Sequence, residues 1–320
     1  MKNLIWVLTT IFILLNTSCR KKEEVTVEEA AISTSDASTF REESDQIINE
    51  ASNYTENTGF GQNNSRVDSF ADSVSVTAID GNGGAKTAIA YLAQRKVVLT
   101  FQDSESKDGQ RTRNGKVIIQ LDTTGNKPKF WGDQNAELKI TFENLRITRK
   151  SDSKFVVFNG TKVVKNTSGG RAIFAFVNSG NGTVTHEISG SVMVNFEDGT
   201  QRSWSISRRR QVEYQKITIS STRNDGVIEQ GVNRFGTDFT TSINDPLVVK
   251  RLSCNSRNQA RVTDGLLTHR VANRTNSIEF GFNSAGVKAT TDCGKTSAKI
   301  SYTNRRNQQS ELILTLYRSL

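Results

Sequence analysis

Arginine side chains beside aromatic rings are the strongest candidates for binding chemistry in this sequence. Arg208, Arg209 and Arg210 lie between Trp204 and Tyr214. Side chains two residues apart share a face of a strand, so Arg208 and Arg210 face the same side as both rings, and Arg209 faces away. Guanidinium groups beside aromatic rings bind carboxylates, sulfates and sugar faces. The pattern predicts a surface for an anionic or glycan ligand; the alternative is arginines paired with acids on a neighbouring strand.

A second pattern, Gly294-Lys295-Thr296, matches the end of a phosphate-binding loop. That loop needs another glycine five residues earlier, so that backbone N–H groups can surround a phosphate, and this position is Ala289. The residues that follow have no helical pattern, so no helix N-terminus is expected to bind a phosphate. The sequence therefore argues against nucleotide binding.

The sequence gives little support for nucleophilic catalysis or for metal binding. Residues 104–107 and 151–154 have the Ser-x-x-Lys spacing with which a lysine can activate a serine, but both stretches read as polar turns. His186 and His269 lie in alternating stretches with no further ligands at zinc spacing. No calcium-binding loop or pair of catalytic carboxylates stands out. We predict a protein that is not an enzyme and that holds no metal or other cofactor.

Cys19 closes a bacterial lipoprotein signal pattern. A positive start is followed by an apolar run over 4–15, which is too short to span a bilayer as a helix. Asn16-Thr17-Ser18 then leads into Cys19, as small residues do in a lipobox. We predict that 1–18 is a removed signal peptide and that Cys19 is acylated, with palmitate among its acyl chains, and anchors the protein in the membrane. The alternative is a secreted protein in which this cysteine is incidental.

The charged residues after Cys19 indicate a location. Lys22-Glu23-Glu24 resembles the short signal that sends lipoproteins of Bacteroidetes to the outer leaflet of the outer membrane. The sequence therefore predicts an outer-membrane lipoprotein on the cell surface. The alternative is an anchor facing the periplasm, because any solvated tether would carry charge.

The two other cysteines, Cys254 and Cys293, are expected to pair with each other. They are the only thiols left once Cys19 carries lipid, and an exported compartment permits disulfides. Neither cysteine has a CxxC neighbour, which argues against a metal-binding or redox-active pair.

Charge is divided unevenly along the chain. Residues 20–80 contain 5 Lys and Arg against 13 Asp and Glu, whereas residues 81–320 contain 36 against 20. An acidic segment thus precedes a basic body. A basic body can attract anionic glycans, nucleic acid or a phosphate-rich membrane surface, although Lys and Arg also occupy the solvent faces of ordinary strands. We expect no specific nucleic-acid partner.

The segment over 19–80 is poor in large apolar residues and is predicted to be a flexible tether. A short helix over 39–52 is the one element expected in it. Thr39 and Glu42 have the spacing of a capping box, and Phe40, Ile47 and Ile48 fall near helical spacing.

The body over 81–320 has the period of β-strands throughout. Val117, Ile119 and Leu121 alternate with more polar residues, and turns carry Gly, Asn and Asp. No convincing helical pattern interrupts the strands, so the sheet must be antiparallel. The fold class predicted is all-β: an antiparallel β-meander forming a long twisted sheet or a two-layer sandwich, with a division into two sub-sheets near 220–235 as an option.

Six short motifs occur in order along the body, at 108–121, 138–147, 159–166, 196–214, 251–266 and 292–302. They resemble a family of uncharacterised Bacteroidetes lipoproteins that share an Arg-x-Gly-Lys strand start, a DGT hairpin before Arg-rich strands and a C-terminal cysteine pair. The resemblance implies lipoprotein export and an all-β fold, and no activity. We therefore expect a cell-envelope lipoprotein that acts as a structural or binding module; the alternative is a glycan-binding or glycan-active surface protein.

Overall fold

The computed structural model describes residues 25–57, 74–79, 84–91, 94–106, 109–128, 130–254, 257–303 and 308–315. The predicted signal peptide, the predicted acylation site Cys19 and the predicted export signal at Lys22, Glu23 and Glu24 lie outside these residues.

Within the described residues, fifteen strands form a single antiparallel sheet, which confirms the predicted all-β fold class. The strands are β1 (Val74–Ile79), β2 (Ala85–Tyr91), β3 (Lys96–Glu105), β4 (Arg111–Leu121), β5 (Ala136–Arg149), β6 (Phe155–Asn166), β7 (Val184–Phe196), β8 (Gln201–Glu213), β9 (Lys216–Ser221), β10 (Val227–Val232), β11 (Asp238–Cys254), β12 (Arg257–Val271), β13 (Arg274–Phe282), β14 (Ser297–Thr303) and β15 (Gln309–Thr315).

Strand order follows chain order except between β8 and β11. There, β10 pairs with the first half of β8 and β9 pairs with its second half, and both pair with β11 on their other side. Two short strands thus share the place of one long strand. The region near 220–235, where a division into two sub-sheets was an option, is a continuous part of the sheet.

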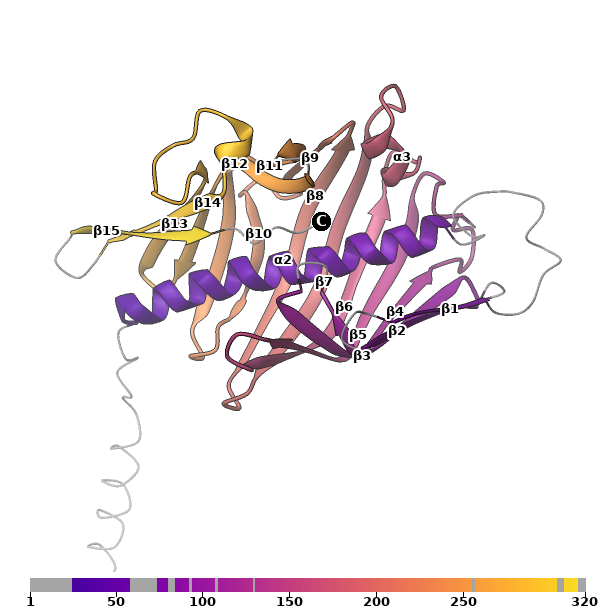
Figure 1. The fold of residues 1–320 in the computed structure, drawn as a ribbon, viewed down its shortest axis with the longest axis horizontal. Coiled ribbons are helices and arrows are strands. Elements are labelled where there is room, and N and C mark those ends of the chain that lie inside the picture. The colour runs from indigo at the N-terminus through magenta and orange to yellow at the C-terminus, as the bar shows by residue number, and fades with distance from the viewer. Residues whose placement is uncertain are drawn as a thin grey trace, which may run out of the picture.

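Alternation along the strands separates a buried face from a wetter one. In β5, Leu138, Ile140 and Phe142 are buried, whereas Lys139 between them is exposed. This is the pattern that the sequence predicts for a strand with one face turned to solvent. The buried faces of successive strands line the concave side of the curved sheet (Figure 1).

A long helix, α2 (Val27–Asn57), lies across this concave side (Figure 1). It contacts β12, β13 and β14 near its start and runs diagonally toward the strands of the N-terminal half. The sequence predicts a helix only over 39–52, inside a tether. The helix is longer than this at both ends, and the described part of the segment packs against the sheet.

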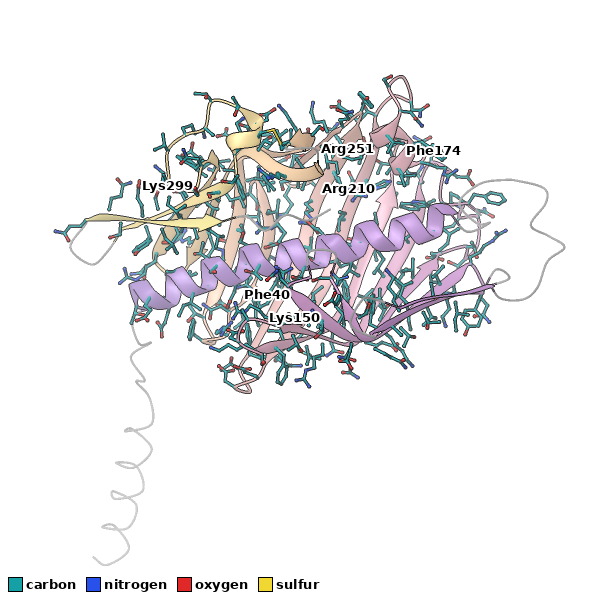
Figure 2. The ribbon with its side chains drawn as sticks, viewed as in Figure 1. Phe40, Lys150, Phe174, Arg210, Arg251 and Lys299 are labelled. Atoms are coloured by element: carbon teal, nitrogen blue, oxygen red, sulfur yellow. A yellow bond between two sulfur atoms is a disulfide. The ribbon has the colours of Figure 1, made fainter. Side chains whose placement is uncertain are left out.

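Phe40, Ile47 and Ile48, on which the prediction of a short helix rests, are buried in the main core. Phe40 lies at the centre, with its ring 5.6 Å from Phe158, 5.5 Å from Phe196 and 6.2 Å from Trp204 between ring centroids. Figure 2 labels Phe40 near the middle of α2. Burying a ring of this size contributes about 1.5–3 kcal/mol, which helps to fix α2 on the sheet.

Glycines allow close approach where β6 meets β7. Gly160 and Gly190 have φ values of 119° and 121°. A Cβ atom at Gly160 would lie 2.5 Å from the carbonyl oxygen of Ser191, and one at Gly190 would lie 2.3 Å from that of Thr161. A side chain at either position would therefore push the two strands apart.

The remaining elements lie at one rim of the sheet. A short helix, α3 (Ala172–Val177), connects β6 to β7, and a 3-10 helix spans Asp292–Gly294. The predicted disulfide is present: Cys254 at the end of β11 is bonded to Cys293 of the 3-10 helix. Among the described residues, no helix combines the length and the apolar character needed to cross a membrane.

Candidate functional site

The candidate site is the interface between α2 and the concave face of the sheet, because charged side chains are concentrated there. The helix is capped at its start by a reciprocal pair: Thr26 N–H donates to Glu29 Oε2 at 2.8 Å, and Glu29 N–H donates to Thr26 Oγ1 at 3.1 Å. This capping box has the same spacing as the one predicted at Thr39 and Glu42. The sequence therefore contained the signal for the true start of the helix, thirteen residues earlier.

Small residues form the buried side of the first turns of α2. They are Ala30, Ser33, Thr34 and Ala37. Their spacing of three and four residues places them on one stripe of the helix, and their size lets the helix backbone approach the strands closely. Because two of the four are polar, this stripe gives only a weak amphipathic signal in the sequence.

Polar side chains of β12 and β13 hold this first part of α2. Asn276 Nδ2 donates to the carbonyl oxygen of Ala30 at 3.1 Å and to Thr34 Oγ1 at 2.8 Å. His269 contacts Ser33 through Nε2 at 3.1 Å and Thr241 through Nδ1 at 2.9 Å. Both ring nitrogens thus have partners from either side of the interface.

His269 is a neutral residue in this setting. Burial disfavours the imidazolium, and the nearby Arg202 and Arg41 add positive charge, so the pKa of His269 falls from 6.5 to about 3. His186 is equally buried, and burial together with Arg210 lowers its pKa well below the usual value. Both histidines therefore serve packing and hydrogen bonding at neutral pH.

Two ion pairs connect the middle of α2 to the region of β10. Arg41 donates from Nε and Nη2 to the two carboxylate oxygens of Glu229 at 2.9 and 2.8 Å. Asp36 accepts from Arg234 in the same two-pronged way, at 2.8 and 2.9 Å. Planar pairing of this kind fixes the orientation of both partners as well as their distance.

Burial affects these two carboxylates differently. For Glu229, burial raises the pKa, but Arg41 and then Arg208 and Arg202 outweigh it and lower the pKa to about 2. For Asp36, burial dominates and raises the pKa in spite of its partner Arg234. Glu229 is therefore firmly ionised, whereas Asp36 takes up a proton more readily than an ordinary aspartate.

The second half of α2 brings two further acids to the sheet. Glu43 pairs with Arg111 of β4 and lies 4.0 Å from the guanidinium of Arg113. Asp45 pairs with Arg208 of β8. Together with Asp36, these acids meet arginines at three separate places along the sheet.

Ser44, between these two acids, accepts a hydrogen bond from Lys162 of β6, with 2.7 Å between Nζ and Oγ. The Ser44 hydroxyl itself donates to the carbonyl oxygen of Arg41 at 3.0 Å. The pKa of Lys162 falls from 10.5 to about 7, mainly because the side chain is buried and secondly because Arg208 adds positive charge nearby. Neither side chain is accessible to solvent to any useful extent.

A lysine of lowered pKa beside a serine hydroxyl is the arrangement that activates a nucleophile. Here, however, Ser44 belongs to the helix and Lys162 to the sheet. The pair exists only while α2 covers it, and it is then closed to a substrate. The geometry therefore favours recognition between helix and sheet over catalysis.

Three of the four residues predicted as a ligand surface are buried. Trp204, Arg208 and Arg210 do share the concave face, as strand alternation requires, but they are buried. Trp204 stacks on Phe40 and Arg208 binds Asp45, so α2 occupies the position expected for a ligand. Tyr214 lies beyond the end of β8 and is exposed.

The neighbouring arginines have protein partners of their own. Arg210 contacts His186 Nδ1 at 2.9 Å on the concave face. Arg209 faces the opposite side and pairs with Glu187 of β7 at 3.0 Å. Pairing with acids on a neighbouring strand, the alternative reading of this cluster, thus holds for Arg209.

The other short motifs have structural roles. Lys295 of the Gly294-Lys295-Thr296 pattern pairs with Asp264 and Asp292 at 3.0 and 3.1 Å. Residues 151–154 form an exposed turn between β5 and β6. Within the described ranges, His, Cys, Asp and Glu do not gather into any group of three or more that could hold a metal ion.

Comparison with known proteins gives no relative: no protein-family model, no curated protein and no solved structure matches the chain.

Proposed function

We propose that this protein is a lipid-anchored binding module of the cell envelope, in which the concave face of the sheet recognises an acidic helix. Its own helix α2 is the resident ligand. The observation that carries the proposal is the match of charge across the interface: Asp36, Glu43 and Asp45 of α2 meet arginines presented by the sheet.

Buried ion pairs are suited to recognition. Removing two charges from water costs nearly as much as their attraction returns, so such pairs add little net stability. A helix without the matching acids would leave buried guanidinium groups unpaired, and this discriminates strongly against wrong partners. A face built only to hold α2 would be expected to be more apolar.

The alternative of a glycan ligand has less support. Of the residues expected to bind sugars, Arg210 is buried beside His186, and Trp204 and Arg208 are covered by α2. A glycan could reach them only after the helix had moved. A helical ligand uses the same residues in the arrangement that the protein already adopts.

A synthetic peptide with the sequence of residues 26–57 tests the recognition. In a variant carrying Asp36→Asn, Glu43→Gln and Asp45→Asn, the resident helix loses the three acids that pair with arginines of the sheet, while the sheet is unchanged. We expect the peptide to bind this variant at one to one, more tightly than it binds the wild type, because the weakened α2 competes less. Isothermal titration calorimetry measures the difference.

The matched control is the same peptide with the same three acids neutralised, which should bind neither protein. Circular dichroism and a cooperative thermal transition check that the variant is folded. If the acidic peptide fails to bind the folded variant, or if both peptides bind it equally, the sheet does not recognise an acidic helix.

The anchoring part of the proposal rests on Cys19 and has its own test. Cys19→Ala, or globomycin treatment of the cells, should leave an unprocessed precursor without lipid, and normal maturation of the variant would contradict it. For surface location, external protease should remove the body from intact cells. Replacing Lys22, Glu23 and Glu24 with alanine should protect it from the protease.

A further inference from the structure

We propose that one rim of the sheet docks on the lipid bilayer and that Phe235 contacts the lipid there. This rim consists of the turns at 233–236 and 272–273, and we call it the proximal rim. The inference rests on the proposed anchoring through Cys19 and adds an orientation of the body and a membrane contact.

The chain enters the folded body at a fixed place. Val25 is buried, and its carbonyl oxygen accepts a hydrogen bond from Arg274, the first residue of β13. Asn276, two residues further along β13, binds the first turns of α2. The start of α2 is therefore held beside the turn that connects β12 to β13.

Only a short length of chain separates this place from the anchor. Cys19 precedes Val25 by six residues. A fully extended chain covers about 3.3–3.6 Å per residue, so the two residues are separated by at most about 22 Å in any conformation. With Cys19 acylated and its lipid chains in the bilayer, the start of α2 lies close to the headgroups.

The direction in which the strands run brings two turns together near the start of α2. β10 ends and β11 begins at the turn 233–236, and β12 ends at the turn 272–273, so antiparallel pairing places both turns at the same rim. Arg234 in the first turn binds Asp36 of α2. The helix α3, by contrast, connects β6 to β7 at the opposite rim, and Figure 2 labels its Phe174 far from the start of α2.

The proximal rim carries exposed apolar side chains and an exposed arginine. Phe235 is 40% exposed, in a turn that Asn233 Oδ1 holds by accepting from the N–H groups of Phe235 and Thr237, both at 3.0 Å. Val232, the last residue of β10, is 37% exposed. Arg270 is exposed at the neighbouring turn. An aromatic ring on a rigid turn, with arginine nearby, suits the boundary between headgroups and acyl chains.

A fluorescent label on a single cysteine tests the orientation. Asn273→Cys places it at the proximal rim, and Ser179→Cys, after α3, is the matched control at the other rim; both residues are exposed. The introduced cysteine is the only free thiol, because Cys19 carries lipid and Cys254 is bonded to Cys293. The full-length acylated protein is reconstituted into phosphatidylethanolamine and phosphatidylglycerol vesicles that contain a nitroxide-headgroup lipid.

We expect strong quenching of the label at 273 and little at 179. Equal quenching at both positions, or stronger quenching at 179, would overturn the orientation. Intact mass measured on the same sample separates the two proposals. An acylated protein with the wrong quenching pattern refutes only the docking, whereas absence of acylation refutes the anchor and the docking together.

The contact by Phe235 is tested in the protein labelled at 273. Phe235→Ala should reduce the quenching and shift the emission to the red, since the rim loses its lipid contact while the anchor remains. Phe174→Ala is the matched control, because Phe174 is 39% exposed at the far rim, and it should change nothing. Unchanged quenching in Phe235→Ala would show that the chain length alone brings the rim near and that Phe235 makes no contact.

Discussion

Lys162 Nζ donates a hydrogen bond to Ser44 Oγ across 2.7 Å, from the middle of a strand to the middle of a helix, in a position closed to solvent. The two residues are separated by 118 positions in the chain. This contact reports directly on whether α2 is docked, because each side of the interface supplies one partner. It also makes docking sensitive to pH.

The first prediction is that stability rises with pH above neutrality. The pKa of Lys162 is about 7 in the folded protein and 10.5 for an ordinary lysine, so between these values the unfolded chain binds more protons. Raising the pH through this window therefore stabilises the fold, by up to about 1.4 kcal/mol per pH unit from this residue. Urea unfolding between pH 7 and 9 measures the slope.

Lys162→Met is the matched variant for this experiment, because methionine keeps much of the side-chain length and removes the proton-binding group. Its stability should depend less on pH in the same window. Equal slopes in the two proteins would show that Lys162 does not titrate near neutrality.

The second prediction concerns the buried pair of Arg41 and Glu229. Arg41→Met leaves the carboxylate of Glu229 buried without its partner and should lower the free energy of unfolding by about 3–5 kcal/mol. The double variant Arg41→Met with Glu229→Leu should recover a large part of this loss, since no unpaired charge remains. Chemical denaturation of both variants gives the comparison.

An exposed pair provides the control for that measurement. Arg223 binds Asp225 at 2.6 Å, but both are open to solvent. Arg223→Ala should leave stability almost unchanged, because water and salt screen such pairs. A loss of stability comparable to that of Arg41→Met would mean that burial does not determine how much stability is lost when an ion pair is broken.

The third prediction is that Phe40 anchors α2 to the sheet. Phe40→Ala removes the ring that packs among Phe158, Phe196 and Trp204, and should cost about 3–5 kcal/mol. Phe174→Ala, at an exposed position, should cost much less. Faster hydrogen exchange along α2 in Phe40→Ala, with the strands far from it little affected, would locate the damage at the interface.

The fourth prediction is that the disulfide contributes measurably to stability. Cys254 and Cys293 are 39 residues apart in the chain, and closing a loop of this length restricts the unfolded state by roughly 3–4 kcal/mol. Replacing both with serine should lower the unfolding free energy by up to that amount. In the wild type, thiol labelling of the unreduced, denatured mature protein should find neither cysteine; two labelled cysteines would contradict the pairing.

The strands could be predicted because their signal is local. Val117, Ile119 and Leu121 alternate with wetter residues, and the two sides of a half-buried strand require this. The pairing of Cys254 with Cys293 could be predicted because the third cysteine of the chain, Cys19, was expected to carry lipid. Antiparallel order followed from the absence of helices that could connect parallel strands.

The length of the helix and its interface with the sheet could not be predicted in the same way. The buried stripe of α2 contains Ser33, Thr34 and Ser44, which look like solvent-facing residues in the sequence alone. Their partners lie far away: Ser33 contacts His269 across 236 positions and Ser44 contacts Lys162 across 118. The local sequence pattern therefore predicted too short a helix, and the arginines of β8 were interpreted as a surface for an external ligand.

The position of α2 also constrains the order in which the protein can fold. The helix is the first described element to be synthesised, yet β12 and β13, which hold its start, are among the last. The hairpins join neighbours in the chain and can form as each strand appears, whereas docking of the helix closes a loop of more than two hundred residues. Protection of α2 against hydrogen exchange should consequently appear after that of β4 to β7 during refolding. Until the last strands are in place, the arginines of the concave face stay open to any acidic helix in the surroundings, so the folding chain passes through a period in which its own N-terminal helix has to compete for them.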